Sequence, residues 1–290
     1  MNDIFNIRRF GRYLLSDIRN CMAGYGLSMT LISLTGLFAY IITAGMSRMI
    51  SGTWAGPELE FRIVTFLLAG LVLFTSMPVK CYGGITEKRK GTAWLMVPVS
   101  VTEKFLSMVI MTAFIVPLVS GGVYLAVDAV ICLIDPTCGR SIIGAGSSFI
   151  EALMRIPEEV QHDLSMLPAL RDIVTQMTNP LLYIDDIIMI SLAFLLGAIC
   201  FKKAKTAKTF LAIMAISIAA GFIAMPIIRC LFPDLMNPVN INMMMSDADL
   251  NTLFDSWIFR NAALIDTIND TVTNLVLMAG IFFRIRTLKH

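Results

Sequence analysis

Charge is scarce in this sequence. Asp, Glu, Lys and Arg together make up 15% of the 290 residues, whereas hydrophobic residues make up 57%. With a mean hydropathy of +0.76, this composition excludes an ordinary soluble domain, because such a domain cannot bury so much apolar surface. The chain is therefore expected to lie in a lipid bilayer, and no nucleic-acid partner is expected.

The residues that most enzymes need are also missing. The only histidines are His162 and His290, which excludes a His-Glu-x-x-His zinc site. It also leaves no histidine base for a serine or cysteine nucleophile within the apolar segments. The phosphate-binding pattern Gly-x-x-x-x-Gly-Lys-[Ser/Thr] does not occur. We therefore expect no enzyme activity, no metal and no cofactor in this chain, and any ATP would be bound by a partner.

Sulfur-containing residues give little further information. The six cysteines show no metal-ligand spacing. A disulfide between Cys132 and Cys138 stays open, with idle or buried thiols as the alternative. The twenty methionines include one cluster, Met243 to Met245, and we interpret them as fillers of packed helices rather than as metal ligands.

Long hydrophobic segments are what the sequence does contain. Each approaches the roughly 20 apolar residues that a helix needs to cross the hydrocarbon core. We therefore predict an all-α, polytopic membrane protein, with one transmembrane domain over residues 1–290. No small-residue cleavage site follows the first segment, which is expected to remain as an uncleaved anchor. The six segments are residues 25–47, 61–79, 105–130, 181–201, 209–231 and 263–283.

The charges that flank these segments are distributed asymmetrically. The N-terminus, the loops 80–104 and 202–208 and the tail from residue 284 hold 16 of the 23 basic residues but only 4 of the 21 acidic ones. We call this the basic side and the opposite one the outer side. Because lysine and arginine are retained in the cytoplasm, both ends of the chain are predicted to be cytoplasmic. The expected location is the cytoplasmic (inner) membrane of a bacterium.

Three stretches outside the spans are predicted to contain helices. Residues 1–24 form a cytoplasmic amphipathic segment, and Gly24 and Gly26 allow a turn into the first span. Residues 131–180 form an outer helical loop, and residues 232–262 form an outer interfacial or re-entrant segment. The polar face of the first stretch is expected to lie near anionic headgroups through Arg8, Arg9 and Arg12.

The cytoplasmic loop 80–104 has three parts. Glu87 to Lys90 form a charged cluster, Trp94 to Val97 form an apolar patch, and Ser100-Val-Thr-Glu103 is a capping box that starts the next span. An apolar patch framed by charge on a short loop is typical of a docking surface for a partner. The alternative is that the tryptophan and its neighbours dip into the headgroup region.

The stretch from Glu87 to Met108 resembles permease subunits of ABC-2-type ATP-binding-cassette transporters. It contains Lys-Arg-Lys-Gly, Trp-Leu-Met-Val-Pro and Ser-Val-Thr-Glu-Lys-Phe-Leu-Ser. The matching sequence motifs cover about twenty residues. The order of segments is similar over the whole chain, with an amphipathic N-terminus, six spans and a helical outer segment before the last span. Trp94 to Pro98 reads Trp-Leu-Met-Val-Pro where the family more often shows an aromatic residue or Leu before Leu-Met-Leu-Pro, which is a minor departure.

The resemblance implies partners and a mechanism. In such permeases the loop between the second and third spans meets the nucleotide-binding subunit, so a separate ABC ATPase chain would bind the ATP. Six helices imply a homodimer, or a heterodimer with a related permease, and export is the expected direction. The implied ATPase-coupling residues are Glu87, Lys88, Arg89, Trp94, Leu95, Met96 and Pro98.

Acidic and amide side chains interrupt the fourth and sixth segments. Ionisable groups in a span are costly unless they meet water or a partner, so these residues are candidates for an acidic outer vestibule on a translocation path. Pairing with Arg171, Arg229 or Arg260 is one alternative, and an aspartate dyad of a membrane enzyme is another. The candidates are Asp185, Asp186, Asp266, Asn269, Asp270 and Asn274.

A second class of function stays open at this point. A non-transporting membrane sensor, immunity protein or scaffold could bind a ligand through the outer helical loops. A gene for an ABC ATPase beside this one would discriminate between the two classes. The sequence does not indicate the substrate.

Overall fold

A computed structural model describes residues 5–145, 180–231 and 261–288 of the chain, and every regular element in these ranges is a helix. This confirms the predicted all-helical class for the described part of the chain. Five helical stretches in these ranges are long and apolar enough to cross a membrane, as expected for a multi-pass membrane protein. They are Ile7–Ser51, Leu59–Thr86, Val101–Ile134, Lys205–Ile223 and Leu264–Thr287.

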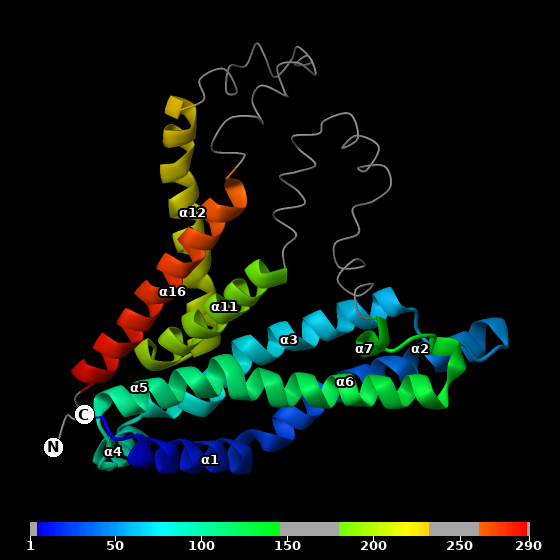
Figure 1. Cartoon of the computed structure of the whole chain (residues 1–290), viewed down its shortest axis with the longest axis horizontal. Helices are drawn as coiled ribbons and strands as arrows, with labels where there is room; N and C mark the ends of the chain where they lie inside the picture. The colour runs from blue at the N-terminus through cyan, green and yellow to red at the C-terminus, as the bar shows by residue number, and fades with distance from the viewer. Residues whose placement is uncertain (1–4, 146–179, 232–260, 289–290) are drawn as a thin grey trace.

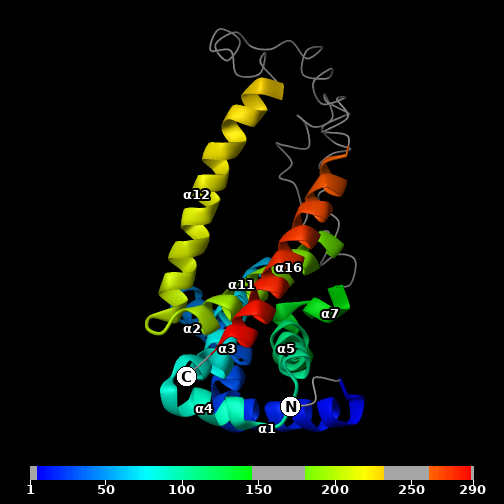
Figure 2. The same cartoon turned by 90° about the vertical axis from the view of Figure 1, so that its left-hand side faces the viewer.

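The helices form two groups that run in different directions (Figure 1). The first group lies along the long axis of the molecule and consists of α1 (Ile7–Ser33), α2 (Thr35–Ser51), α3 (Leu59–Tyr82), α5 (Val101–Ile110) and α6 (Val116–Ile134). The second group crosses the first steeply (Figures 1 and 2) and consists of α11 (Pro180–Cys200), α12 (Lys205–Leu231) and α16 (Ala262–Thr287). One membrane normal cannot be parallel to both groups, so at least one group is tilted in a flat bilayer.

Short elements connect these helices. A π-helical turn, η2 (Met111–Ile115), joins α5 to α6, and α3 continues through η1 (Gly83–Thr86) and α4 (Lys88–Met96) towards α5. Of the predicted outer loop 131–180, the structure describes only the start, with η3 (Pro136–Cys138) and α7 (Ile142–Ala145). The rest of that loop, and nearly all of the segment 232–262, lie outside the described residues.

The first helix differs from the prediction of a turn near residue 24. α1 runs unbroken through Gly24 and Gly26 and ends at Ser33, where Leu34 separates it from α2. A glycine in a helix interior costs only about 1 kcal/mol. Cys21 and Met29, which stand on either side of the two glycines in the sequence, are both buried in the core, and this packing keeps the helix continuous. The predicted turn is therefore wrong.

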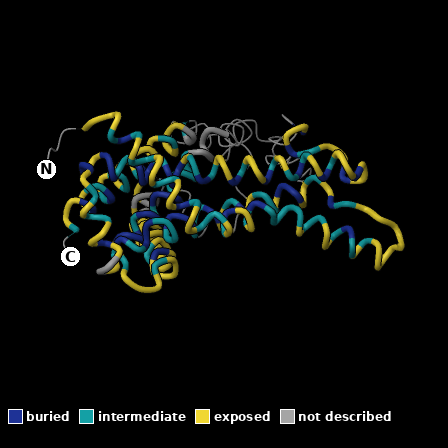
Figure 3. The backbone as a smooth tube through the Cα atoms, turned by 90° about the horizontal axis from the view of Figure 1, so that it is seen from below, coloured by how far each residue is buried: buried dark blue, intermediate teal, exposed yellow. Residues whose placement is uncertain are grey.

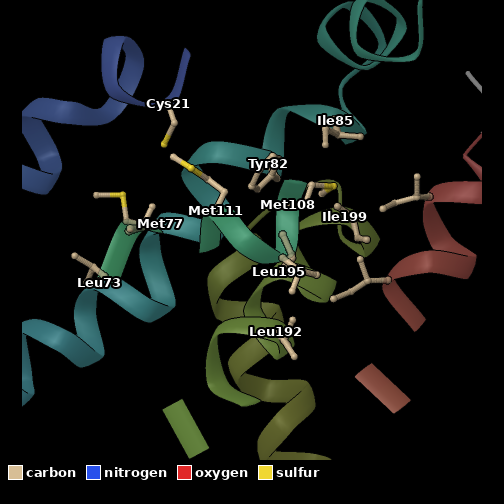
Figure 4. Packing of buried hydrophobic residues seen from close by; sticks show 14 of the residues in the cluster. Cys21, Leu73, Met77, Tyr82, Ile85, Met108, Met111, Leu192, Leu195 and Ile199 are labelled. Atoms are coloured by element: carbon tan, nitrogen blue, oxygen red, sulfur yellow. The ribbon is translucent and has the colours of Figure 1, made fainter. Parts of the chain in front are cut away.

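The largest core lies where the two groups meet (Figure 4). Met77 of α3, Met108 of α5 and Leu195 of α11 are fully buried there. We call this core the junction, and because α1, α3, α5, α6, α11 and α16 all contribute buried residues to it, it holds helices of both groups together. Its buried members are Cys21, Met29, Leu73, Met77, Tyr82, Ile85, Met108, Val109, Met111, Val116, Leu192, Leu195, Ile199, Ile281 and Ile285.

Burial decreases away from the junction. The far end of α2 is exposed (Figure 3), and Met49 there is 88% exposed. α12 packs mainly on α11, where a side chain at Gly197 would come within 2.7 Å of the Thr209 Cβ. Most apolar side chains of α12 are exposed all round the helix, which is typical of a helix that faces lipid or another chain.

Candidate coupling site

The predicted capping box at the start of α5 is present. The Ser100 Oγ accepts a hydrogen bond from the Glu103 backbone N–H at 3.3 Å, and the Ser100 backbone N–H donates to Glu103 Oε2 at 3.0 Å. Each residue thus satisfies a backbone donor that a helix start would otherwise leave unpaired. The capping box fixes where the loop 80–104 ends and the third span begins.

Glu103 also holds the N-terminus of α1. Its carboxylate is fully buried, and it accepts hydrogen bonds from the Arg9 guanidinium at 2.8 to 3.1 Å and from the Asn6 backbone N–H at 2.8 Å. A buried carboxylate needs several donors of this kind to offset its loss of hydration. The sequence predicts that Arg9 faces lipid headgroups, whereas the structure pairs it with Glu103.

The neighbouring residue, Lys104, holds α4. Its Nζ donates to the backbone carbonyls of Trp94 and Leu95 at 3.0 and 3.3 Å, at the C-terminal end of α4, where a cation is favoured. The same ammonium lies 4.7 Å from the centre of the Trp94 ring, within the range of a cation–π contact. The Trp94 indole N–H donates to the Tyr13 hydroxyl at 3.2 Å. α4 is therefore attached to both α5 and α1.

The predicted coupling residues divide into two sets. Trp94 and Leu95 are half-buried, and Trp94 packs against the junction. Met96 is 76% exposed, and Pro98 and Glu87 are exposed as well. Lys88 and Arg89 begin α4, and their side chains lie outside what the structure describes. Of the predicted coupling residues whose side chains are described, Met96, Pro98 and Glu87 are therefore the exposed ones, whereas Trp94 packs inwards.

A second acid, the half-buried Asp17 of α1, also joins α1 to the neighbouring helices. It accepts hydrogen bonds from the Tyr82 hydroxyl at 2.6 Å and from the Ser107 hydroxyl at 2.8 Å. Tyr82 belongs to α3 and Ser107 to α5, so the carboxylate joins three helices. The sequence gives no indication of this contact, because its members are 65 and 90 residues apart.

The second group of helices is connected to the same region. The Lys205 Nζ at the start of α12 donates to the Gly83 carbonyl, and the Thr86 hydroxyl donates to the Phe201 carbonyl at 3.4 Å. The Arg284 Nε near the end of α16 donates to the Ile199 carbonyl at 3.2 Å. These bonds satisfy carbonyls at turns and helix ends.

The predicted acidic residues come together between α11 and α16, away from α4 (Figure 2). Asp270 and Asn274 are buried, and the Asn274 Nδ2 donates to the Asp185 carbonyl at 3.4 Å. Asp186 lies close enough to Asp266 and Asp270 for their charges to interact. Asn269 is exposed on α16 and hydrogen-bonds Asp270.

Among the residues that the structure describes, no cation pairs with these acids. The three ion pairs of the described residues are Arg9–Glu103, Arg62–Asp128 and Lys90–Glu87, and none of them includes an acid of α11 or α16. Arg171 and Arg260 lie outside the described ranges, and the Arg229 side chain is not described. No group of three or more metal-ligating side chains is formed within the described residues.

The outer ends of α3 and α6 are joined by a buried ion pair. Arg62 Nη1 lies 2.8 Å from Asp128 Oδ1, and Arg62 Nη2 donates to the carbonyls of Cys138 and Arg140. The Ile142 N–H donates to the other Asp128 oxygen at 2.7 Å. Both side chains are buried against each other.

Cys132 and Cys138 are free thiols in the structure. Burial and the nearby Asp135 carboxylate raise the pKa of Cys138 to about 11, so this thiol is neutral at pH 7. Hydrogen bonds from Thr137, Tyr40 and Trp54 lower the pKa of Asp135 to about 2, which keeps it ionised. A neutral thiol beside a carboxylate is a poor nucleophile, and both thiols are drawn free, which corresponds to the second of the two alternatives left open by the sequence.

Comparison of the chain with protein-family models, with curated proteins and with solved structures found no match.

Glu103→Gln is expected to lower the melting temperature of the detergent-solubilised protein more than Ser100→Ala does. The first change removes the charge shared by Arg9 and two backbone N–H groups, whereas the second removes only a helix cap worth about 1 kcal/mol. Glu87→Gln is the matched control, because its ion pair with Lys90 is exposed, and it should stay within about 0.5 kcal/mol of the parent protein. Equal stability of Glu103→Gln and the control would show that Glu103 does not hold α1 to α5.

Proposed function

We propose that this chain is the membrane-spanning permease subunit of an ABC-2-type transporter and works as an exporter. The proposal rests on the resemblance of the stretch Glu87 to Met108 and on how that stretch is held in the fold. In this proposal six spans cross the bilayer, with both ends of the chain in the cytoplasm. The spans are α1 with α2, α3, α5 with α6, α11, α12 and α16.

The arrangement of the helices supports this topology. The start of α1, the loop with α4, the turn between α11 and α12, and the end of α16 lie at one end of the molecule (Figures 1 and 2). Hydrogen bonds connect these stretches. They are the four stretches that carry the basic residues, and the positive-inside rule assigns them jointly to the cytoplasm.

The attachment of α4 is the observation that carries the proposal. An element that transmits motion must be joined to the parts that it moves. Lys104 holds the end of α4 to α5, and Trp94 joins it to Tyr13 of α1. A force on the exposed Met96 end of α4 would therefore pass to α1 and α5 together, and through the junction to the remaining helices.

The partner in this proposal is an ABC ATPase chain, which binds and hydrolyses the ATP. Two permease copies, identical or related, would each present α4 to one ATPase. Closure of the ATPases on ATP would draw the two α4 helices together, and rigid-body rocking of the two bundles would open a path to the outside. The acids between α11 and α16 lie towards the outer ends of their helices, where they would line that path.

The exposed end of α4 provides the first test. Met96→Asp is expected to remove most of the ABC ATPase that co-purifies with the protein in mild detergent, because it places a charge in the centre of the docking surface. Met96 makes no core contact that would unfold the protein. Co-purified ATPase is measured as the ratio of the two chains and as ATP hydrolysis.

Met49→Asp is the control, because it places the same charge on another exposed methionine, at the far end of α2. It should keep the ATPase. If Met96→Asp keeps the ATPase as well, the docking surface lies elsewhere. A parent protein that purifies without any ATPase would contradict the transporter proposal and favour a sensor or scaffold.

The acids between α11 and α16 provide the second test. Residues that serve a function often lower the stability of the folded protein. Asp270 is a buried acid that forms no ion pair among the described residues. Asp270→Asn is therefore expected to raise the stability of the solubilised protein, by about 1 kcal/mol. Asp128→Asn makes the same change in an acid that is paired with Arg62, and it should lower the melting temperature. A loss of stability in Asp270→Asn would show that the Asp270 charge is paired with a cation.

A further inference from the structure

A cavity of about 330 Å³ lies where α11 crosses α3 and α6. It is bounded by the central part of α3, from Phe66 to Phe74, by Pro117 to Tyr124 of α6, and by Ile187 and Ile190 of α11. Helices that cross steeply diverge away from their point of contact, so side chains do not fill the space between them. The cavity is thus a consequence of the two-group arrangement.

The wall of the cavity is apolar. No charged side chain lines it, and the Ser33 hydroxyl at its edge is already used, donating to the Met29 carbonyl at 2.9 Å. The Ser120 hydroxyl is buried and has no hydrogen-bond partner. An apolar cavity of roughly 150 Å³ stays dry and accepts an apolar guest such as benzene. A space about twice as large with this wall favours a hydrocarbon over water or a polar molecule.

Two glycines increase the space. Gly121 of α6 and Gly70 of α3 both line the cavity. A Cβ atom at Gly121 would meet nothing within 4 Å, and one at Gly70 would come no closer than 3.8 Å to Phe74. Glycine inside a helix costs about 1 kcal/mol relative to alanine. Larger residues would fit at both positions, and they would fill the cavity.

The cavity is open to the side of the molecule. Leu67 and Leu71 line it and are also 46% and 49% exposed. Both belong to the middle third of α3, which is the part of a spanning helix that meets the hydrocarbon core of a bilayer. A chain of a surrounding lipid can therefore reach the cavity without crossing a polar layer.

We propose that this cavity binds one hydrocarbon chain of a bilayer lipid, inserted from the side between α3, α6 and α11. The occupant is recognised by its apolar surface and not by its headgroup, because the wall offers no charged group. The bound hydrocarbon chain would fill the space between the two groups of helices and so stabilise the way they pack across each other. This proposal requires only that the helices lie in a membrane, and it does not depend on the transport proposal.

The test uses the full protein in phosphatidylcholine vesicles in which a small fraction of the lipid has a photoreactive diazirine in the middle of one acyl chain. After illumination, mass spectrometry locates the lipid adducts. Adducts are expected on Ser120 and Tyr124, which are buried at 5% and 3% exposure and which bulk lipid does not reach. Leu118, which is 75% exposed on the same helix, reports labelling by bulk lipid.

Gly121→Leu is expected to reduce the adducts on Ser120 and Tyr124 several-fold, because the leucine fills the cavity. Gly122→Leu is the matched control: its position is exposed and does not line the cavity, so the adducts should persist. Ser120→Ala should also keep the Tyr124 adduct, because recognition is apolar. Adducts confined to Leu118 in the parent protein would overturn the proposal, as would equal labelling of Ser120 and Tyr124 in the two leucine variants. If Gly121→Leu does not fold, Gly70→Leu replaces it. The adduct map of the parent protein still shows whether a lipid chain enters the cavity.

Discussion

The buried carboxylate of Glu103 is the contact on which the basic side of the molecule depends. It caps α5 through Ser100, and it binds Arg9 and the Asn6 backbone at the start of α1. The next residue, Lys104, extends to the end of α4. Two adjacent residues of opposite charge on the first turn of α5 thus fix one helix each. The N-terminal end of α1, which would fray in isolation, is held by charge-assisted hydrogen bonds.

On the basic side, the described contacts join helices of both groups. The junction and the Lys205 bond connect the first group to the second, Asp17 joins α1 to α3 and α5, and Arg284 joins α16 to α11. Among the described residues of the outer side, the Arg62–Asp128 pair joins α3 to α6 and Tyr40 of α2 donates to Asp135, while α12 diverges from α16 (Figure 2). Packed cores shift between discrete arrangements rather than deform continuously. Motion that begins at α4 would accordingly move the basic side as one body and change the spacing of the outer ends.

Local features of the fold could be predicted from the sequence, and long-range ones could not. The apolar segments predict the long helices, and Ser100 with Glu103 predicts the cap of α5. The acidic and amide residues of the fourth and sixth segments are recognisable from the sequence, but it does not show that Asp270 is buried whereas Asp266 is exposed. In contrast, Arg9 and Glu103 are 94 residues apart, and only tertiary packing brings them together. The inward position of Trp94 depends on Tyr13 of another helix, and the cavity at Gly121 depends on a crossing that no local pattern encodes.

In the proposed function, the exposed end of α4 contacts an ABC ATPase. A photoreactive phenylalanine derivative introduced in place of Met96 and illuminated in intact cells tests this contact. One dominant cross-linked product that contains the ATPase chain is expected. Cross-links to lipid alone, or to a protein on the outer side of the membrane, would rule the contact out.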